Sequence, residues 1–495
     1  MRAVTAERGA GSVVAPPAPQ DLYRILLLRK NASELLVAGE RPQFTLPCVE
    51  IPKWERVAEN MNAVVGKRYG ISPVCLFATN LSAIAADGEQ PLYQVMETRE
   101  ADVAAPEGTS WLPVDSFSDQ SFADEQDSLA LTTTLRQIHE FENEATIGPF
   151  GKPGWIEELS SWVQDQVHPY WLCLTGEIRQ LNASPTFALL RFKTNGTSLW
   201  FKAVGEPNLR EFPISVTLSR LFPGFVPSVI ATHPAWHGWL MTEFAGSTLD
   251  EVSDACAWER AAQTLGELQI ASLGKTDQLL EAGCRDLRIN SLLPLVDPFV
   301  EVMSELMSQQ QKASPPTLGR EELRTLGRQI KEALSELTEL GIPDTLGHLD
   351  FNPGNILCSA DQCIFLDWAE AYVGPPFPTF QFLIEHARQR RVGNTVCDQQ
   401  LINRYNRSWF RAASPAIVAS GQSVTPLTAA FFYAVALDAW HDAERLLTPR
   451  LASFFRSLTR RMQREAEESK ANTSESRHRR VIGIGGAPQR NQRCP

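Results

Sequence analysis

The chain has 495 residues and a formal net charge of −12, and 43% of its residues are hydrophobic against 21% that are charged. This length is too great for one ordinary core, the composition is typical of a soluble globular protein, and the negative charge argues against nucleic acid as the main partner. No apolar run is long enough to cross a membrane, and nine cysteines without a CxxC pair indicate buried thiols of a cytoplasmic protein.

Residues 1–20 lack the apolar segment of a secretory signal and are predicted to be a disordered leader. Residues 21–142 are predicted to form a small α/β domain. In it, "DLYRILLLRKNASELLVAGE" favours two strands joined by the turn "KNAS", and "YQVMETRE" favours a further strand. Between them, "WERVAENMNAVVGKRYGI" predicts a helix that ends near Gly66 or Gly70, with one apolar side made of Val57, Met61, Val64 and Val65.

The segment "LPCVEIPKWERVAENMNAVVGKRYGI" resembles the loop and helix of a Nudix domain. That family holds a metal ion against a diphosphate with carboxylates on the helix. The corresponding positions here are occupied by Ala63, Val64, Lys67 and Arg68. The resemblance therefore implies a degenerate copy that serves packing or recognition and has no hydrolase activity.

Glycine and proline in "NEATIGPFGKPGW" predict a linker at residues 143–154. After it, "WIEELSSWVQDQV" is an amphipathic helix, and four apolar runs predict strands: "YWLCLTGEIRQL", "TFALLRFKTNG", "TSLWFKAVG" and "WLMTEF". The pattern is then almost entirely helical to about residue 464, and the polar residues 465–495 are predicted to be a disordered tail. A sheet-rich lobe before a helical lobe predicts an α+β fold with a ligand cleft between the lobes.

Three polar residues in "GHLDFNPGNILCSADQCIFLDWAEAYVGPP" carry the chemistry. Asp350 and Asn355 are separated by a Pro-Gly pair that excludes a helix, and Asp367 follows a short run predicted to be a strand. A carboxylate and an amide aimed at one point suit Mg²⁺, which takes phosphate oxygens as further ligands. A second carboxylate can then act as a base toward a hydroxyl. Each residue alone could merely cap a turn, but the spacing of all three favours phosphoryl transfer.

The sequence "HLDFNPGNIL" followed by "IFLDWAEAYVGPP" resembles the aminoglycoside phosphotransferase and choline kinase-like family. That family carries His-Gly-Asp, four residues, Asn, and then Ile-Asp-Trp. The resemblance covers residues 155–464 and implies a two-lobed protein-kinase-like fold. It also implies ATP or GTP as co-substrate, Mg²⁺ as cofactor, and a hydroxylated small molecule as the phosphate acceptor. Leu349 stands where the family has glycine, and its larger side chain could shift the catalytic loop.

The resemblance assigns roles to five polar residues: Asp350 as catalytic base, Asn355 and Asp367 as Mg²⁺ ligands, Lys202 at the end of the third strand as the phosphate contact, and Glu211 on the next helix as the partner of that lysine. Glu206, in the loop before the helix, is an alternative to Glu211. His348 is expected to brace the catalytic loop through hydrogen bonds and not to transfer protons.

The resemblance also implies the position of the nucleotide. In "HGWLMTEFAGSTLD", Met241 would lie behind the base, and Thr242, Glu243 and Phe244 would offer backbone groups to the purine edge. The following "STLDE" is predicted to open a helix. No Gly-rich loop is present, and "TGEIRQLNASPTF", with Ser184 near its turn, is the candidate to cover the phosphates.

The acceptor is left open by the sequence. Asp438 and Asp442 beside Trp440, on a predicted helix, could hold a cationic acceptor, although a core Trp440 with a solvated acidic face explains the pattern as well. Glu370 is another candidate contact. A nucleotide-binding regulator with little transfer activity and a protein kinase are the alternative functions. The short segment after Asp367 and the missing Gly-rich loop speak against the protein kinase. The choice between ATP and GTP and the oligomeric state also stay open.

Overall fold

The computed structural model describes residues 19–53, 56–79, 81, 92–118, 120–143, 149–390 and 398–482, with side chains as far as residue 469. The chain divides into two compact units. The first comprises Met1–Pro207 and Ile230–Glu243, and the second comprises Asn208–Val229 and Phe244–Pro495. The predicted leader lies almost wholly outside the described residues. The two domains predicted at residues 21–142 and 155–464 stay predictions.

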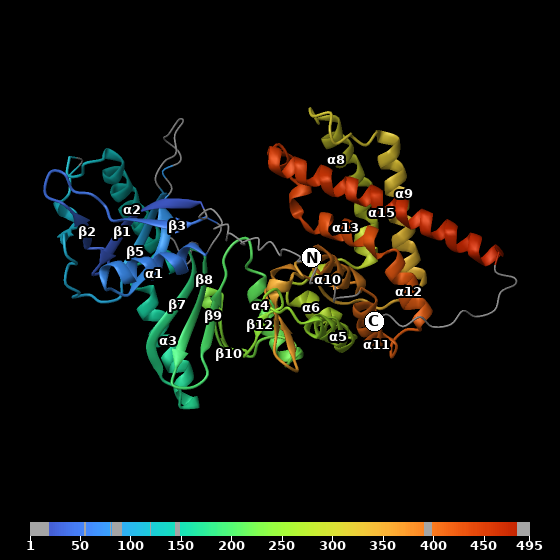
Figure 1. The fold of residues 1–495 in the computed structure, drawn as a ribbon, viewed down its shortest axis with the longest axis horizontal. Coiled ribbons are helices and arrows are strands. Elements are labelled where there is room, and N and C mark those ends of the chain that lie inside the picture. The colour runs from blue at the N-terminus through green and yellow to red at the C-terminus, as the bar shows by residue number, and fades with distance from the viewer. Residues whose placement is uncertain are drawn as a thin grey trace, which may run out of the picture. The chain divides into compact units, whose positions relative to one another are not determined.

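The first unit opens with a mixed sheet whose order is β4-β5-β1-β2-β6, with β3 paired to β1 (Figure 1). The strands β1 and β5 run parallel, whereas β1 and β2 form the predicted antiparallel hairpin. The strand bounds are β1 Gln20–Arg29, β2 Glu34–Ala38, β3 Cys48–Pro52, β4 Pro73–Thr79, β5 Leu92–Thr98 and β6 Thr109–Pro113. The predicted turn "KNAS" is confirmed, and its first three residues all have positive φ.

Helices cover both faces of this sheet. Ile25 and Leu27 of β1 share a core with α1 (Val57–Tyr69), and Leu26 and Leu28 share another core with α2 (Glu125–Asn143). A strand buried on both faces reads as a continuous apolar run, which explains "RILLLR". The predicted α/β arrangement of this segment is therefore confirmed.

Helix α1 ends at Gly70, which adopts a φ of 68° as one of the two predicted terminal glycines. Its buried residues are Ala58, Met61 and Val65, whereas Val64 is 37% exposed. The predicted apolar face is therefore confirmed for Met61 and Val65. Ala58 also belongs to the buried face of the helix, whereas Val64 lies at its edge.

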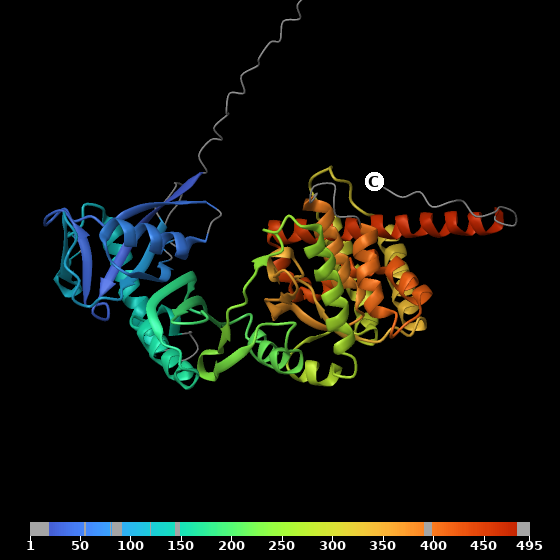
Figure 2. The ribbon, with the colours of Figure 1, turned by 60° about the horizontal axis from the view of Figure 1, so that its bottom comes forward.

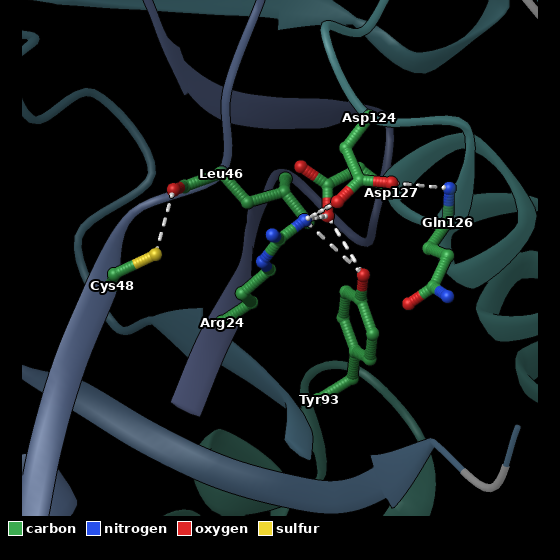
Figure 3. A network of polar contacts seen from close by, with 7 residues as sticks. All are labelled: Arg24, Leu46, Cys48, Tyr93, Asp124, Gln126 and Asp127. Carbon is green, nitrogen blue, oxygen red and sulfur yellow. Dashed lines mark hydrogen bonds and ion pairs between the residues drawn. The ribbon is translucent and has the colours of Figure 1, made fainter. Parts of the chain in front are cut away.

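A partly buried ionic cluster connects the start of α2 to the sheet (Figure 3). Arg24 of β1 donates to Asp124 at 2.7 Å and to Asp127 at 2.5 Å, and the Tyr93 hydroxyl of β5 donates to Asp127 at 2.8 Å. Asp124 also accepts the backbone N–H of Gln126, which caps the first turn of the helix. Removing Arg24 would leave the buried carboxylate of Asp127 without its cation, so this pair holds α2 in place.

A second sheet, of order β10-β11-β9-β8-β7, lies in the same unit after α3 (Trp155–Val167). The four predicted strands are confirmed, and the full set is β7 Leu174–Ser184, β8 Phe187–Thr194, β9 Leu199–Ala203, β10 Val229–His233 and β11 Gly238–Thr242. One hydrophobic cluster includes residues of both sheets together with Phe150 and Trp155. The side chain of Gln180 in β7 also bonds both the N–H and the carbonyl of Cys75 in β4. The described part of the predicted linker, residues 149–154, is thus packed into this core.

The carboxyl of Glu97 in β5 meets the start of α3. Both of its oxygens accept the N–H of Gly154 at 2.9 Å, and its side chain is almost wholly buried. Burial raises the pKa of Glu97 to about 8, and the nearby charge of Glu157 adds to the rise. A buried carboxyl with a raised pKa favours its protonated form.

The raised pKa of Glu97 predicts that the stability of the folded protein depends on pH. The folded protein holds a proton on this carboxyl up to about pH 8, whereas the unfolded chain releases it near pH 4.3, about the model-peptide value. The stabilisation is therefore complete below the unfolded pKa and is lost as the pH rises toward 8. Chemical denaturation of the first-unit transition should show a free energy of unfolding that falls by a few kcal/mol between about pH 5 and pH 9.

Glu97→Gln should flatten this dependence and raise stability at pH 8, since glutamine keeps the shape and an acceptor oxygen without the charge. The exposed Glu107 offers a matched control, because Glu107→Gln should leave the slope unchanged. An unaltered slope in Glu97→Gln would show that Glu97 is not the group responsible.

The second unit is mainly helical (Figure 2). Its first helix is α4 (Glu211–Leu221), which is the helix predicted to carry Glu211. Its other main helices are α5 Ala255–Ala271, α6 Thr276–Glu281, α8 Val296–Ser308, α9 Arg320–Glu339, α10 Phe377–Arg390, α11 Asp398–Trp409, α12 Pro415–Ser423, α13 Thr425–Ala436 and α15 Pro449–Ile482. Two small sheets, β12-β15-β16 and β13-β17-β14, lie among them. Their bounds are β12 Ser247–Thr248, β13 Arg285–Asp286, β14 Thr345–His348, β15 Ile356–Cys358, β16 Cys363–Phe365 and β17 Ala371–Gly374. The predicted α+β fold is confirmed.

Two local predictions were wrong. The segment "STLDE" does not open a helix, because Ser247 and Thr248 pair with β15 and α5 begins only after its N-cap Asp254. The disordered tail was predicted from residue 465, but α15 continues to Ile482 and extends past its neighbours in red in Figure 2. Its Ala466 is buried and Arg461 forms an i,i+4 ion pair with Glu465, so this charged segment is helical. Residues 483–495 lie outside the described part.

Candidate functional site

One face of the second sheet in the first unit carries Lys202. Leu189 of β8 and Trp239 of β11 are its cross-strand neighbours. The opposite face, with Leu190, Phe201 and Leu240, is fully buried. The ammonium of Lys202 lies 5.7 Å from the ring centre of Phe187 and 5.8 Å from that of Trp239. These rings limit the positions that the ammonium can occupy.

Met241 lies on the same face as Lys202, because its strand partner Trp200 is two residues before Lys202 in β9. Trp200, in turn, donates its indole N–H to Glu243 at 3.1 Å, and Arg191 donates to both oxygens of Glu243. Arg191 lowers the pKa of the Glu243 carboxyl. This half-buried, partly apolar surface beside a lysine is suited to a purine nucleotide.

The backbone N–H of Glu243 donates to the carbonyl of Ser198 at 2.9 Å. This group is therefore engaged within the sheet, and a purine contact at the predicted connection must use other groups of Thr242, Glu243 or Phe244. Ser184 occupies the turn between β7 and β8, as predicted, and its hydroxyl accepts the N–H of Thr186 at 3.2 Å.

In the second unit, His348 ends β14 and is completely buried. Its Nδ1 accepts the N–H of Asp350 at 3.1 Å, and its Nε2 lies 3.0 Å from the carbonyl of Leu366. A carbonyl oxygen only accepts, so the proton is on Nε2. Burial lowers the pKa of His348 and favours this neutral form. His348 therefore joins the loop of Asp350 to the residue before Asp367, which is the bracing function expected for it.

The exposed carboxylate of Asp350 is held by two amides. Asn352 donates to its Oδ1 at 2.9 Å, and Asn355 donates to its Oδ2 at 3.2 Å and to its backbone carbonyl at 3.0 Å. Because Asn355 uses its nitrogen in these bonds, its carbonyl oxygen Oδ1 is the atom suited to a metal ion. Asn352 was not singled out in the sequence, although the turn-forming "NPGN" was the available signal.

Asp367 has a φ of 63° and a ψ of 61°, a left-handed backbone conformation that residues other than glycine rarely adopt. Backbone hydrogen bonds fix the two residues before it. Leu366 donates to the carbonyl of Asn355 at 2.8 Å, and Phe365 donates to the carbonyl of Phe225 at 2.8 Å. Rare conformations of this kind persist where the surrounding structure fixes them, and they cluster at functional sites.

Asn355 immediately precedes β15, and Asp367 follows β16 after one residue, so one hairpin positions both predicted Mg²⁺ ligands. One amide and one carboxylate fit Mg²⁺, which is usually bound through one or two carboxylates with substrate phosphates and water. Within the described part of the chain, no group of three or more His, Cys, Asp and Glu residues is arranged to hold a metal ion.

A scan of family models matches residues 211–386 to the phosphotransferase enzyme family. The matched segment contains Glu211, Asp350, Asn355 and Asp367 and begins after Lys202. This segment is therefore similar to the phosphotransferase enzyme family. The predicted family relationship and the prediction of an enzyme that transfers a phosphoryl group are thereby confirmed.

A search of curated proteins found no match. Among solved structures, the chain is similar to a macrolide 2′-phosphotransferase from Brachybacterium faecium, with 14% identity, coverage of 60% of this chain and 97% of the other, and a TM-score of 0.41. A choline/ethanolamine kinase family protein from Mesorhizobium loti is 14% identical, with coverage of 66% of this chain and 100% of the other and a TM-score of 0.42. An ethanolamine kinase from Plasmodium vivax is 14% identical, with coverage of 62% of this chain and 85% of the other and a TM-score of 0.41. The assignment to the phosphotransferase enzyme family depends on the family match alone.

Leu349 departs from the glycine of the aminoglycoside phosphotransferases, and the structure explains why it is accepted. Its side chain is 4% exposed within the main core of the second unit, and its N–H donates to the carbonyl of Glu370 at 3.0 Å. Among the described residues, Leu349 is not one of those with positive φ. The position therefore has no conformational need for glycine.

Leu349→Gly should destabilise the protein, because it removes a buried side chain and adds backbone freedom. We expect a loss of about 3–5 kcal/mol in the free energy of unfolding, measured by urea denaturation of the second-unit transition. Leu447→Gly is a control at a leucine that is 75% exposed and should have a much smaller effect. Equal stability of Leu349→Gly and the wild type would contradict the packing function of Leu349.

Glu211 is 2% exposed in the first turn of α4. Lys202 belongs to the first unit and Glu211 to the second, so the predicted ion pair between them stays a prediction. Glu206, the alternative, lies in the exposed segment before α4.

The predicted acceptor contacts differ from their expected arrangement. The helix containing "FFYAVALDAWHDAERLL" ends at Ala436, and Trp440 is 1% exposed with its indole N–H donating to the carbonyl of Val435. Asp442 caps the next short helix. The interpretation that places Trp440 in the core is therefore confirmed, and the alternative of a cation–π site at this ring is not supported.

Glu370 and Asp438 share one cation. Arg285 of β13 donates to Glu370 at 3.1 Å and to Asp438 at 3.0 Å. Sequence reasoning missed Arg285, and no spacing signal links residues so far apart. It also missed Tyr433, whose pKa is raised by burial and by the charges of Asp350 and Glu370.

Proposed function

We propose that this enzyme transfers the γ-phosphoryl group of a nucleoside triphosphate, ATP or GTP, to a hydroxyl group of a small molecule. The observation that carries the proposal is the Asp350 carboxylate, exposed and fixed by the amides of Asn352 and Asn355. A fixed, solvent-accessible carboxylate can orient an acceptor hydroxyl and accept its proton. The family match of the same segment supports this chemistry.

The remaining roles follow the chemistry of each side chain. Lys202 would neutralise phosphate charge, and Glu211 would orient that lysine. Asn355 Oδ1 and the carboxylate of Asp367 would bind Mg²⁺, which supplies charge neutralisation on the phosphates when bound. Met241 and the connection Thr242–Phe244 would contact the base, and Ser184 would contact the phosphates. His348 keeps Asp350 and Asp367 in register through its two hydrogen bonds.

We infer a hydroxylated small molecule as the acceptor. The carboxylates of Glu370 and Asp438 are paired with Arg285, which reduces the negative charge they offer to a cationic group. Asp350 and Tyr433 present a carboxylate and a phenol, and these suit hydrogen bonds to hydroxyl groups. These residues therefore favour an acceptor bound through its hydroxyl groups over one bound through a cationic amine.

The test is nucleotide consumption with a panel of acceptors, each with ATP and with GTP in the presence of Mg²⁺. The panel contains macrolides, aminoglycosides, choline, ethanolamine and amino alcohols, and product is identified by its added phosphate mass. Turnover that depends on one acceptor and is lost in Asp350→Asn supports the proposal. Tight nucleotide binding without turnover would favour the regulatory alternative, and labelled phosphate appearing in protein substrates would favour a protein kinase.

A further inference from the structure

Cys358 and Cys363 lie directly opposite each other in the hairpin β15–β16. The register pairs Cys358 with Cys363, Leu357 with Ile364, and Ile356 with Phe365. The two sulfur atoms are 2.8 Å apart, and both side chains are buried, at 5% and 0% exposure. The family resemblance uses neither residue.

The hairpin geometry is suited to a covalent bond between them. Ser359 donates to the carbonyl of Gln362, and Leu366 donates to the carbonyl of Asn355. These bonds mark the pairs 359/362 and 355/366 as hydrogen-bonded, so by alternation the pair of Cys358 and Cys363 is not hydrogen-bonded through its backbone. Such pairs have Cα atoms about 4.5 Å apart, at the lower end of the range of about 4.4–6.8 Å found in disulfides.

The surroundings favour reaction at Cys363. The hydrogen bond with Cys358 lowers the pKa of Cys363, burial opposes this effect, and the guanidinium of Arg260 lowers the pKa further. Arg260 is fixed beside the turn by its bond to the carbonyl of Ser359 at 2.9 Å. The thiolate is the reactive form of cysteine, and the position of Arg260 at this turn leads us to assign Cys363 as the nucleophile and Cys358 as the resolving thiol.

We propose that Cys358 and Cys363 are a modification site that hydrogen peroxide oxidises to a reversible cross-strand disulfide. The thiolate of Cys363 attacks one peroxide oxygen, the O–O bond breaks, and the released hydroxide takes up a proton to become water. The sulfur of Cys358 then attacks the sulfenic acid, and the hydroxyl group leaves as a second water with the proton of Cys358. Two thiols lose two electrons and two protons, and one peroxide is reduced to two waters.

The disulfide would fasten the hairpin that holds the catalytic segment. Asn355 immediately precedes β15, Asp367 follows β16 after one residue, and β12 pairs with Cys358 through Ser247. Each strand of the hairpin has only three residues, so local opening admits a small oxidant. A cross-link between facing strands restricts the unfolded and opened states of this segment. The inference depends on these two thiols and is independent of the proposed phosphoryl transfer.

Peptide mass analysis of the full-length protein tests the proposal. After treatment with hydrogen peroxide, remaining thiols are alkylated and the protein is digested with trypsin. The peptide of residues 332–388 contains Cys358 and Cys363 and no other cysteine. We expect this peptide without alkyl groups and lighter by two hydrogens, and we expect dithiothreitol to restore two alkylatable thiols. Alkylation of both cysteines in a sample whose exposed Cys256 is oxidised would overturn the proposal.

Thermal unfolding supplies a second measurement. Oxidised wild type should unfold at a higher temperature than the reduced protein, and dithiothreitol should remove the difference. Cys358→Ser should lose this redox-dependent shift, whereas Cys256→Ser, at an exposed thiol, should retain it. A shift that persists in Cys358→Ser would also overturn the proposal. The mass measurement on the wild type needs no variant and decides the question if Cys358→Ser does not fold.

Discussion

Asp350→Asn should reduce phosphoryl transfer to the acceptor by about 10²–10⁴-fold, the range that general-base catalysis contributes. The substitution keeps the size of the side chain and removes the group that accepts the hydroxyl proton. It also places an NH₂ group opposite either Asn352 or Asn355, both of which donate to Asp350. One of these two hydrogen bonds is therefore lost.

Nucleotide binding should survive in Asp350→Asn, because Asp350 is not assigned to the metal or the phosphates. Calorimetry with the Mg²⁺ complex of a nucleoside diphosphate measures this separately from steady-state transfer. Asp361→Asn is the matched control, since Asp361 is an exposed aspartate in the turn of the same hairpin, and it should retain full transfer. Full turnover in Asp350→Asn would remove Asp350 from the catalytic role.

The elements that could be predicted from the sequence are those defined by neighbours in the chain. The alternation in "LWFKA" sets Leu199 and Phe201 in the core and Lys202 on the other face, as β9 confirms. Helix α4 begins at Glu211, and the loop of Asp350 follows a short buried strand. In each case the signal and the structure span only a few residues, so local propensity and periodicity determine the result.

The features that escaped prediction depend on contacts between distant segments. Ser247 and Thr248 look like the start of a helix, but pairing with a strand more than a hundred residues later makes them a strand. Arg285 neutralises two carboxylates from separate parts of the chain. Tertiary packing overrides local preference in these cases, and a single sequence carries no record of the partner.

Asp367→Asn should remove most of the Mg²⁺-dependent gain in nucleotide affinity and thereby abolish transfer. Asparagine tolerates the left-handed conformation that Asp367 adopts at φ 63°, whereas alanine would add backbone strain to the loss of charge. The variant therefore isolates the metal-binding carboxylate. We expect the Mg²⁺ concentration needed for half-maximal nucleotide binding to rise at least about tenfold, because Mg²⁺ relies on one or two carboxylates in such sites.

The decisive comparison is nucleotide binding with and without Mg²⁺. In Asp367→Asn the affinity without Mg²⁺ should be no lower than that of the wild type, since Lys202 and the proposed purine contacts Met241 and Thr242 lie in the other unit. The exposed Asp361 of the same hairpin again gives the control, and Asp361→Asn should keep the full response to Mg²⁺. An unchanged Mg²⁺ response in Asp367→Asn would exclude this carboxylate as a ligand. Loss of binding without Mg²⁺ as well would mean that Asp367 supports the fold and not the metal, because charge removal alone should favour an anionic nucleotide.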